Sequence, residues 1–523
     1  MKKYYPIILS ALLFWACSDE LKITADDEFQ DVATLSHEMI VLGEKLNDPY
    51  SLENMQQAVA MLYPESKAGR EGIKETDIYV RFLPRDSDEF DLLQGMGVEL
   101  IDHPLDYEIV REGDYYHDPE LDESQMTWQY AVVSHDFVFP TSVRYEVLEK
   151  CYIPERDTGT KADGIDWTAV EREAYLLSGN EYLLEPETKA KNSSCPSGNI
   201  SIIDKKLGPE PIGVKGVKIA VNSFVKYSYT YTDENGDYTI PRNYSSTVRY
   251  RIVYKNEIGF AIGMNLLVTP ASACTLGRNS SEGVSIIIDE NSDRKMFSRS
   301  VVNNTAYEYF RMCEANALTA PPKNLRFWLF QKLDVSSSVM MQHGAILDHA
   351  LVSSFLGIAA DLVSIFMPDI TLGLSASGDY SSIYSTTCHE LAHASHFQNV
   401  GSTFWNKYIV YVLKSSILDG DMYGSGNREN AGCCEVGEMW AYFMEDLLYE
   451  ERYEETNPGA WRTFWFNPRI LRELNDKGIN RGMIMRAMNA KATGKEILKD
   501  NLISLYPDSK VLIEQTFNEF YYE

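Results

Sequence analysis

The spacing of apolar positions predicts a mixed α+β unit over residues 36–155. An apolar stripe at helical spacing predicts a helix over residues 53–62, and residues 77–84 alternate between apolar and polar as a strand does. Residues 88–97 predict a helix that ends at glycine, and residues 98–110 predict a further extended segment. We therefore expect a small N-terminal α+β domain.

Alternating patterns dominate the middle of the chain. Residues 214–222 and 246–254 each alternate over several positions, as strands with one buried face do. Between them stands Asn235-Gly236, a dipeptide that strongly favours a tight hairpin turn. The acidic residues around this turn could also indicate a calcium loop, but the ligand spacing and the terminal glutamate of such a loop are missing. We therefore expect a central group of strands with a turn at this position.

Helical periodicity dominates the C-terminal part of the chain, which predicts a mainly α-helical domain there. One further helix is expected between the N-terminal domain and the central strands. The predicted helices cover residues 167–177, 305–315, 384–398, 435–449 and 470–478.

Composition and charge narrow the classes of partner. The 523 residues include 44% hydrophobic and 24% charged residues, which is ordinary for a globular protein, but the net charge is −29. A nucleic-acid partner requires a basic surface, and anionic lipid attracts basic segments, so the charge argues against both. The eight cysteines include no CxxC pair, which argues against a structural zinc site built from thiolates.

The first twenty residues predict export. Lys2 and Lys3 precede an apolar stretch over residues 6–16, which is too short to cross a bilayer and predicts a cleaved signal peptide. Cys17 follows directly, as in bacterial lipoprotein signals, where this cysteine carries the lipid; the alternative is an ordinary secretory signal with a chance cysteine. Residues 18–20, Ser-Asp-Glu, resemble the surface-export signal of Bacteroidetes lipoproteins. The resemblance implies a protein on the surface of the bacterial outer membrane, attached to the membrane through its lipid anchor only.

A chain of this length predicts about three domains, and the expected fold class is multidomain α+β. The expected units, in order, are the signal peptide (1–16), an acidic tether (17–35), the small N-terminal α+β domain (36–155), a linker with one helix (156–197), a central domain of strands (198–290) and a mainly α-helical domain (300–523).

The segment TTCHELAHASHF, residues 386–397, carries the strongest chemical signal in the chain. His389 and His393 are four residues apart, so they lie one turn apart on the same face of a helix. Two imidazoles in this arrangement can bind one zinc ion at about 2.0–2.1 Å each. Glu390 follows the first histidine, which places it beside the metal as a candidate general base. The alternative is a core helix whose histidines have a structural role.

A catalytic zinc site needs a third protein ligand and a fourth position that is open to water. His396 continues the same helical face, but it lies about 10.5 Å along the axis from His389, too far to share one ion. We expect His396 to orient a ligand, to face the substrate or to be structural. A second apolar helix, within residues 433–450, carries Glu435 and Glu438 as further candidates.

These motifs resemble a known family. HELAHASHF together with VGEMWAYF is similar to a family of Bacteroidetes surface lipoproteins with a zinc peptidase domain of the gluzincin type, in which a glutamate from a second helix is the third ligand. YVRFLP, HPLDYEI and GDYYHDP resemble the same family, and VKGVKIAV with TDENGDYTI resembles a carboxypeptidase-regulatory-like β-sandwich. These resemblances imply that the central strands (198–290) form a β-sandwich and that the C-terminal domain (300–523) is zincin-like.

The resemblance implies Glu438 as the third ligand, because GEMWAYF is similar to the ligand helix of that group. Glu435 is the alternative, either as the ligand or as a residue that orients the site. The acidic residue that usually stands four positions after the ligand is replaced by Tyr442 in this chain.

The expected function is hydrolysis of peptide bonds in a peptide or protein substrate at the cell surface, with one zinc ion per chain and Glu390 as general base. Tyr384, His396 and Tyr442 are candidates for the donor that stabilises the developing oxyanion. The alternative is a non-catalytic surface binding or adhesion protein with a vestigial or structural zinc site. The intact His-Glu-His trio favours hydrolysis, because a structural zinc site does not need the glutamate.

Overall fold

The computed structural model describes residues 39–113, 115–122, 125–157, 164–186, 195–263, 271–331, 336–344, 368–375, 378–460 and 464–520. The predicted signal peptide, Cys17 and the acidic tether lie outside the described residues and stay predictions. Within the described ranges, every helix is too short or too polar to span a lipid bilayer.

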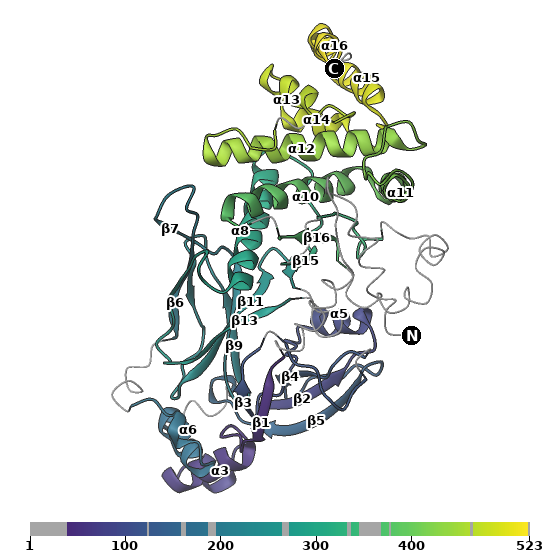
Figure 1. The fold of residues 1–523 in the computed structure, drawn as a ribbon. Coiled ribbons are helices and arrows are strands. Elements are labelled where there is room, and N and C mark those ends of the chain that lie inside the picture. Colours follow the sequence, from purple (N-terminus) through teal and green to yellow (C-terminus); the bar gives the residue numbers. More distant parts are fainter. Residues whose placement is uncertain are drawn as a thin grey trace.

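The N-terminal part of the chain forms two small antiparallel sheets with helices beside them (Figure 1). Helix α5 packs on one of these sheets, because Leu93 of α5 shares a buried apolar cluster with Val80 and Phe82 of strand β2. The sheet orders are β1-β3 and β4-β2-β5. The elements are β1 (Val41–Lys45), α3 (Leu52–Leu62), α4 (Lys67–Glu71), β2 (Asp77–Leu83), α5 (Ser87–Gly95), β3 (Tyr107–Arg111), β4 (Gln129–Ser134), β5 (Arg144–Cys151) and α6 (Trp167–Leu177).

Two further sheets occupy the centre of the molecule. Their strands are β6 (Ser197–Ile203), β7 (Pro211–Gly213), β8 (Val217–Ser223), β9 (Lys226–Tyr231), β10 (Asp237–Thr239), β11 (Val248–Asn256), β12 (Ala261–Ile262), β13 (Ala273–Asn279), β14 (Ile286–Ile288), β15 (Arg326–Phe330) and β16 (Ile370–Gly373). The larger sheet has the order β16-β15-β12-β11-β8-β9, with β13 paired to β11. Its β16-β15-β12 end is parallel, and its other strand pairs are antiparallel. The smaller sheet has the order β10-β6-β14, with β7 beside β6.

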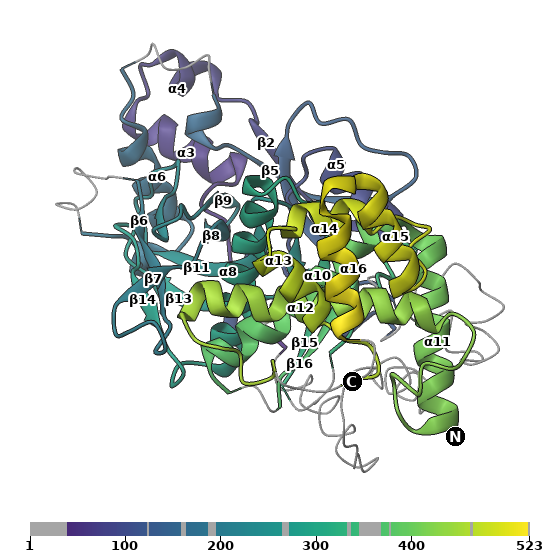
Figure 2. The same cartoon turned by 90° about the horizontal axis from the view of Figure 1, so that it is seen from above.

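Long helices lie beside the larger sheet and carry the candidate site. α8 (Arg294–Ala315) packs on β11 and on α10 (Tyr380–Val400), and α12 (Ala431–Tyr453) lies along α10 (Figure 1). Helices α13 to α16 lie beyond α12, and Figure 2 shows them from above. The remaining bounds are α11 (Ser402–Asp419), α13 (Arg469–Asp476), α14 (Arg481–Ala487), α15 (Lys495–Leu505) and α16 (Lys510–Glu519). One continuous buried apolar core extends from Ile200 in β6 to Phe517 in α16.

The mixed α+β class predicted from the sequence is confirmed. The seven predicted helices appear as α3, α5, α6, α8, α10, α12 and α13, most of them longer than their periodic segments. The domain boundary predicted near residues 290–300, however, falls within the larger sheet, which has strands on both sides of it. β15 and β16 follow this boundary in sequence, yet β15 pairs with β12, which precedes it.

The turn predicted at Asn235-Gly236 is present, but the strands beside it do not form a hairpin. Gly236 has φ 81°, and its amide donates to the carbonyl oxygen of Asp233 at 3.0 Å. β9 before the turn pairs with β8, and β10 after it pairs with β6. A Cβ at Gly236 would lie 2.0 Å from the carbonyl oxygen of Ile200, so the close packing of this turn against β6 requires glycine.

Candidate metal centre

Helix α10 brings two imidazoles together in the core. Its first turn is capped by Asp379, whose carboxylate accepts from the Ser382 amide at 2.8 Å. His389 and His393 then lie one turn apart with only 6% and 1% of their surfaces exposed. Their Nε2 atoms are 3.1 Å apart, which shows that both rings turn the same nitrogen toward one point.

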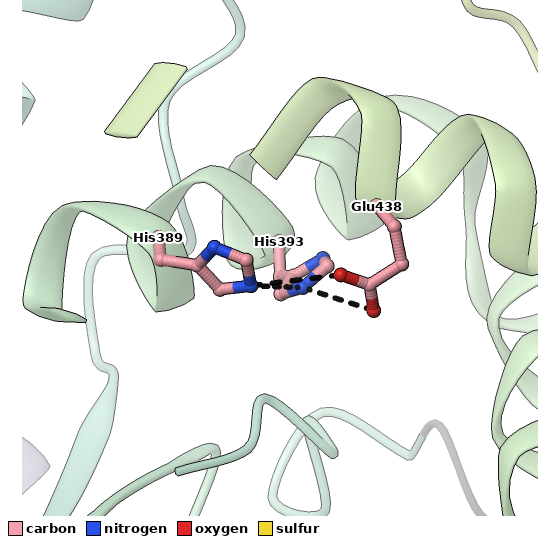
Figure 3. A group of neighbouring side chains, drawn as sticks. All are labelled: His389, His393 and Glu438. Atoms are coloured by element: carbon pink, nitrogen blue, oxygen red, sulfur yellow. Dashed lines mark hydrogen bonds and ion pairs between the residues drawn. The ribbon is translucent and has the colours of Figure 1, made fainter. Parts of the chain in front are cut away.

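Helix α12 adds a carboxylate to the same point (Figure 3). The Glu438 oxygens lie 3.6 Å from the Nε2 atoms of His389 and His393, one oxygen to each ring. These three residues form the one group of potential metal ligands found among the described residues. We refer to His389, His393 and Glu438 as the metal triad.

The metal triad fits a tetrahedral cation. Ligands about 2.05 Å from a tetrahedral zinc ion lie about 3.3 Å from one another. This is close to the 3.1 Å between the two Nε2 atoms and to the 3.6 Å from each Nε2 atom to a Glu438 oxygen. Glu438 is completely buried, and its Oε2 atom has no hydrogen-bond partner among the residues that the structure describes. Its Oε1 atom accepts from the Tyr408 hydroxyl of α11 at 2.6 Å. One carboxylate oxygen is therefore held by the protein, and the other is available to a metal ion.

Glu445 orients the His389 ring through Nδ1, the ring nitrogen that does not face Glu438. Its Oε2 atom lies 2.9 Å from Nδ1 of His389, so this nitrogen carries the proton and Nε2 keeps the lone pair that a metal needs. The other oxygen of Glu445 accepts from Ser385 at 2.6 Å and from Asn457 at 3.3 Å. A carboxylate beside a histidine ligand in this way fixes the ring and increases its basicity.

The charges within this group depend on one another. Burial alone would favour neutral carboxyl groups, but His393 and His389 outweigh it and lower the pKa of Glu438. Burial likewise disfavours a charged His389, but the neighbouring carboxylates of Glu438 and Glu445 outweigh it and raise its pKa well above the usual value. Protons and a metal ion therefore compete for the same nitrogen atoms, so metal affinity is expected to fall as the pH falls.

Glu390 lies beside the metal triad without joining it. The residue is 1% exposed, and burial raises the pKa of its carboxyl group. Its Oε2 atom lies 2.7 Å from the Ser338 hydroxyl, which is also 2.8 Å from the Glu390 carbonyl oxygen. This is the position that a proton acceptor beside a metal would occupy.

The structure does not bring Glu435 or His396 into the metal triad. Glu435 accepts from the Lys495 amide at 2.9 Å and so connects α12 to the start of α15. His396 is completely buried with its ring against Phe404 and Trp405, and within the described part of the chain neither ring nitrogen has a hydrogen-bond partner. Burial, with a smaller contribution from His393, lowers the pKa of His396 to about 3, so the imidazole is neutral.

The two tyrosines predicted as oxyanion donors lie in different surroundings. Tyr384 is buried, with its hydroxyl 3.5 Å from the Leu448 carbonyl oxygen, so it faces α12. Tyr442 is half-buried, and its ring centre lies 4.6 Å from that of His389. The Tyr442 hydroxyl lies 3.0 Å from the Tyr423 hydroxyl. Of the two, Tyr442 borders the metal triad.

Sequence reasoning missed three residues that support the site: Glu445, Tyr408 and Ser338. Glu445 follows Glu438 by seven residues, which is two turns on the same helix face, so heptad spacing was the available signal. Tyr408 and Ser338 lie in segments for which periodicity predicts no element. Only the tertiary fold brings them to the metal triad.

Comparisons with known proteins assign no family to the chain: no protein-family model matches it, and no curated protein matches it significantly.

Proposed function

We propose that the chain is a zinc-dependent peptidase that hydrolyses peptide bonds. The observation that carries this proposal is the metal triad beside a buried carboxylate, Glu390. Glu390 lies on α10 with the two histidines of the triad, but it is not one of the ligands. Three protein ligands leave a fourth position for water or substrate, which is typical of catalytic zinc sites and not of structural ones. The two nitrogen donors and one oxygen donor suit zinc.

In this proposal the chain's own residues bind and orient the reactants. Zinc, when bound, supplies Lewis acidity, which polarises the scissile carbonyl and makes water easier to deprotonate. Glu390 accepts the proton of the attacking water and passes it to the leaving amine. Tyr442, which borders His389, is the best placed of the predicted oxyanion donors. The expected substrate is a peptide or protein, and the predicted lipid anchor would hold the enzyme at the bacterial cell surface.

Metal analysis tests the ligand assignment. The purified full chain should hold about one zinc ion, as sites with three protein ligands do. Glu438→Ala should remove most of the metal, because it deletes a completely buried ligand. Glu435→Ala is the matched control on the same helix and should keep the metal, since Glu435 contacts Lys495 instead. Retained zinc in Glu438→Ala, with loss in Glu435→Ala, would reverse the assignment.

Turnover on a mixed peptide library tests the reaction. Glu390→Gln keeps the size of the side chain but removes the proton acceptor, so turnover should fall by about 10²–10⁴-fold while zinc content stays unchanged. A parent protein that is loaded with zinc and cleaves nothing would contradict the peptidase proposal. That result would favour the alternative of a surface binding or adhesion protein with a vestigial site.

A further inference from the structure

Ser338 lies in a short extended segment that the fold holds from two sides. Ser337 exchanges two backbone hydrogen bonds with Thr371 of β16, at 2.9 and 2.8 Å. On the other side, the indole nitrogen of Trp405, in α11, donates to the Ser338 carbonyl oxygen at 3.0 Å. Trp405 is completely buried and Ser338 is 6% exposed. The backbone that carries the Ser338 hydroxyl is therefore fixed relative to α10.

Of the two carboxylate oxygens of Glu390, the Ser338 hydroxyl contacts one only, and it also lies 2.8 Å from the Glu390 backbone carbonyl oxygen. Its Oγ atom lies 2.7 Å from Oε2, and Oε1 of Glu390 makes no hydrogen bond to any residue that the structure describes. The contact spans 52 positions in sequence, so it depends on the tertiary fold and not on the helix. The two carboxylate oxygens of Glu390 are thus unequal.

This inequality has a chemical consequence. Glu390 is adjacent in sequence to His389, and carboxylate oxygens are themselves zinc ligands. A buried carboxylate with free rotation would be attracted to a cation held by the metal triad and could fill the open position. A hydrogen bond from a fixed hydroxyl to Oε2 opposes that rotation and leaves Oε1 directed toward the attacking water.

We propose that Ser338 is a positioning residue for Glu390: its hydroxyl holds Oε2, keeps the carboxylate off the metal and presents Oε1 as the proton acceptor. The inference rests on the peptidase proposal, because it assigns a role in the same reaction. Ser338 acts through Glu390 and does not contact the reacting atoms.

The test uses the zinc-loaded full chain and a peptide that the parent cleaves. Ser338→Ala should lower kcat by about 10–100-fold, the range typical of residues that orient a reactive group, with KM and zinc content nearly unchanged. Ser338→Thr keeps the hydroxyl and should restore most of kcat. Ser337→Ala is the matched control. It removes a hydroxyl from the same segment, but the hydroxyl that contacts Glu390 belongs to Ser338.

A double-mutant cycle separates positioning from general damage. If Ser338 acts through the carboxylate, Ser338→Ala should have little further effect on the residual kcat of Glu390→Gln. Equal losses in both backgrounds, or an equal loss in Ser337→Ala, would overturn the inference and indicate a structural role. An active parent with an unaffected Ser338→Ala would overturn this inference alone. A zinc-loaded parent that cleaves no peptide would overturn the proposed function and this inference together.

Discussion

At the scale of single residues, Glu445 shows how the fold can supply a contact that the sequence motif lacks. The motif resemblance placed an acidic partner four residues after Glu438, where this chain has Tyr442. Glu445 lies three residues further along the same helix and reaches Nδ1 of His389, while Glu438 faces Nε2 of the same ring. The His389 imidazole thus lies between two carboxylates from one helix. Tyr442, at the expected position, packs its ring against His389 instead.

We expect Glu445→Gln to weaken zinc binding by about 10–100-fold, because a neutral amide orients His389 less firmly and lowers its basicity. The ligands themselves remain, so the bound stoichiometry at saturating zinc should stay the same. Competition with a chelator of known affinity measures the change. Glu450→Gln is the matched control, since Glu450 pairs with Arg472 on α13. An affinity equal to the parent's in Glu445→Gln would show that the contact with His389 is not needed.

Residues that approach the metal triad from other segments explain why the site was only partly predictable. The triad's two histidines and Glu390 follow from spacing within one helix, which sequence alone fixes. Glu438 required a resemblance to choose it over Glu435, and the deciding facts are that Glu438 is completely buried and Glu435 contacts Lys495. The choice between a functional and a structural His396 also depends on packing, because its aromatic neighbours come partly from α11.

At the scale of elements, the strongly periodic helices were predictable and the short parallel strands were not. α10 begins at the Asp379 cap, and both α10 and α12 carry buried apolar residues that leave a pattern in the sequence. β15 and β16 have five and four residues, and most of their side chains are buried, so neither shows the alternation of a half-exposed strand.

A buried charge network fixes the C-terminal end of α12 to the rest of the fold. Arg452 pairs with Asp204, which follows β6, at 3.0 Å and with Glu308 of α8 at 2.8 Å. The Asp204 side chain is 0% exposed, and it also accepts from the Tyr453 hydroxyl at 3.0 Å. The network therefore ties the helix that carries Glu438 to the end of β6, in the smaller central sheet, and to α8.

Arg452→Met should lower the free energy of unfolding by about 3–5 kcal/mol, because it leaves Asp204 buried without its cation. Urea denaturation followed by tryptophan fluorescence measures the change. Arg428→Met provides the comparison: Arg428 pairs with Asp419 at a partly exposed position, so its loss should cost at most about 1 kcal/mol. Equal and small effects in the two variants would mean that the Arg452 network contributes no more than a surface pair.

At the scale of the whole molecule, the helices that carry the candidate site and the central strands form one structural unit. The sequence predicts separate domains because the pattern changes from alternating to helical near residue 300. The structure instead continues the larger sheet across this point, from β12 to β15 and β16, and buries both parts in one core. Local periodicity reports the type of each element but not which strands will pair, so this continuity could not be predicted from sequence.

A fragment test follows from this continuity. Residues 300–523 alone would lose the partner strand of β15, the first turn of α8 and the apolar side chains that β6, β8 and β11 contribute to the core. We expect this fragment to show no cooperative urea transition and to bind no stoichiometric zinc, because its remaining apolar surface has no counterpart to pack against.

Residues 164–523 serve as the matched fragment. They keep both central sheets, the whole core and Glu171, which pairs with the buried Lys226 at 2.7 Å. This longer fragment should unfold cooperatively and hold about one zinc ion per chain. Cooperative unfolding with stoichiometric zinc in residues 300–523 would instead establish the helical part as an independent domain and restore the boundary that the sequence predicts.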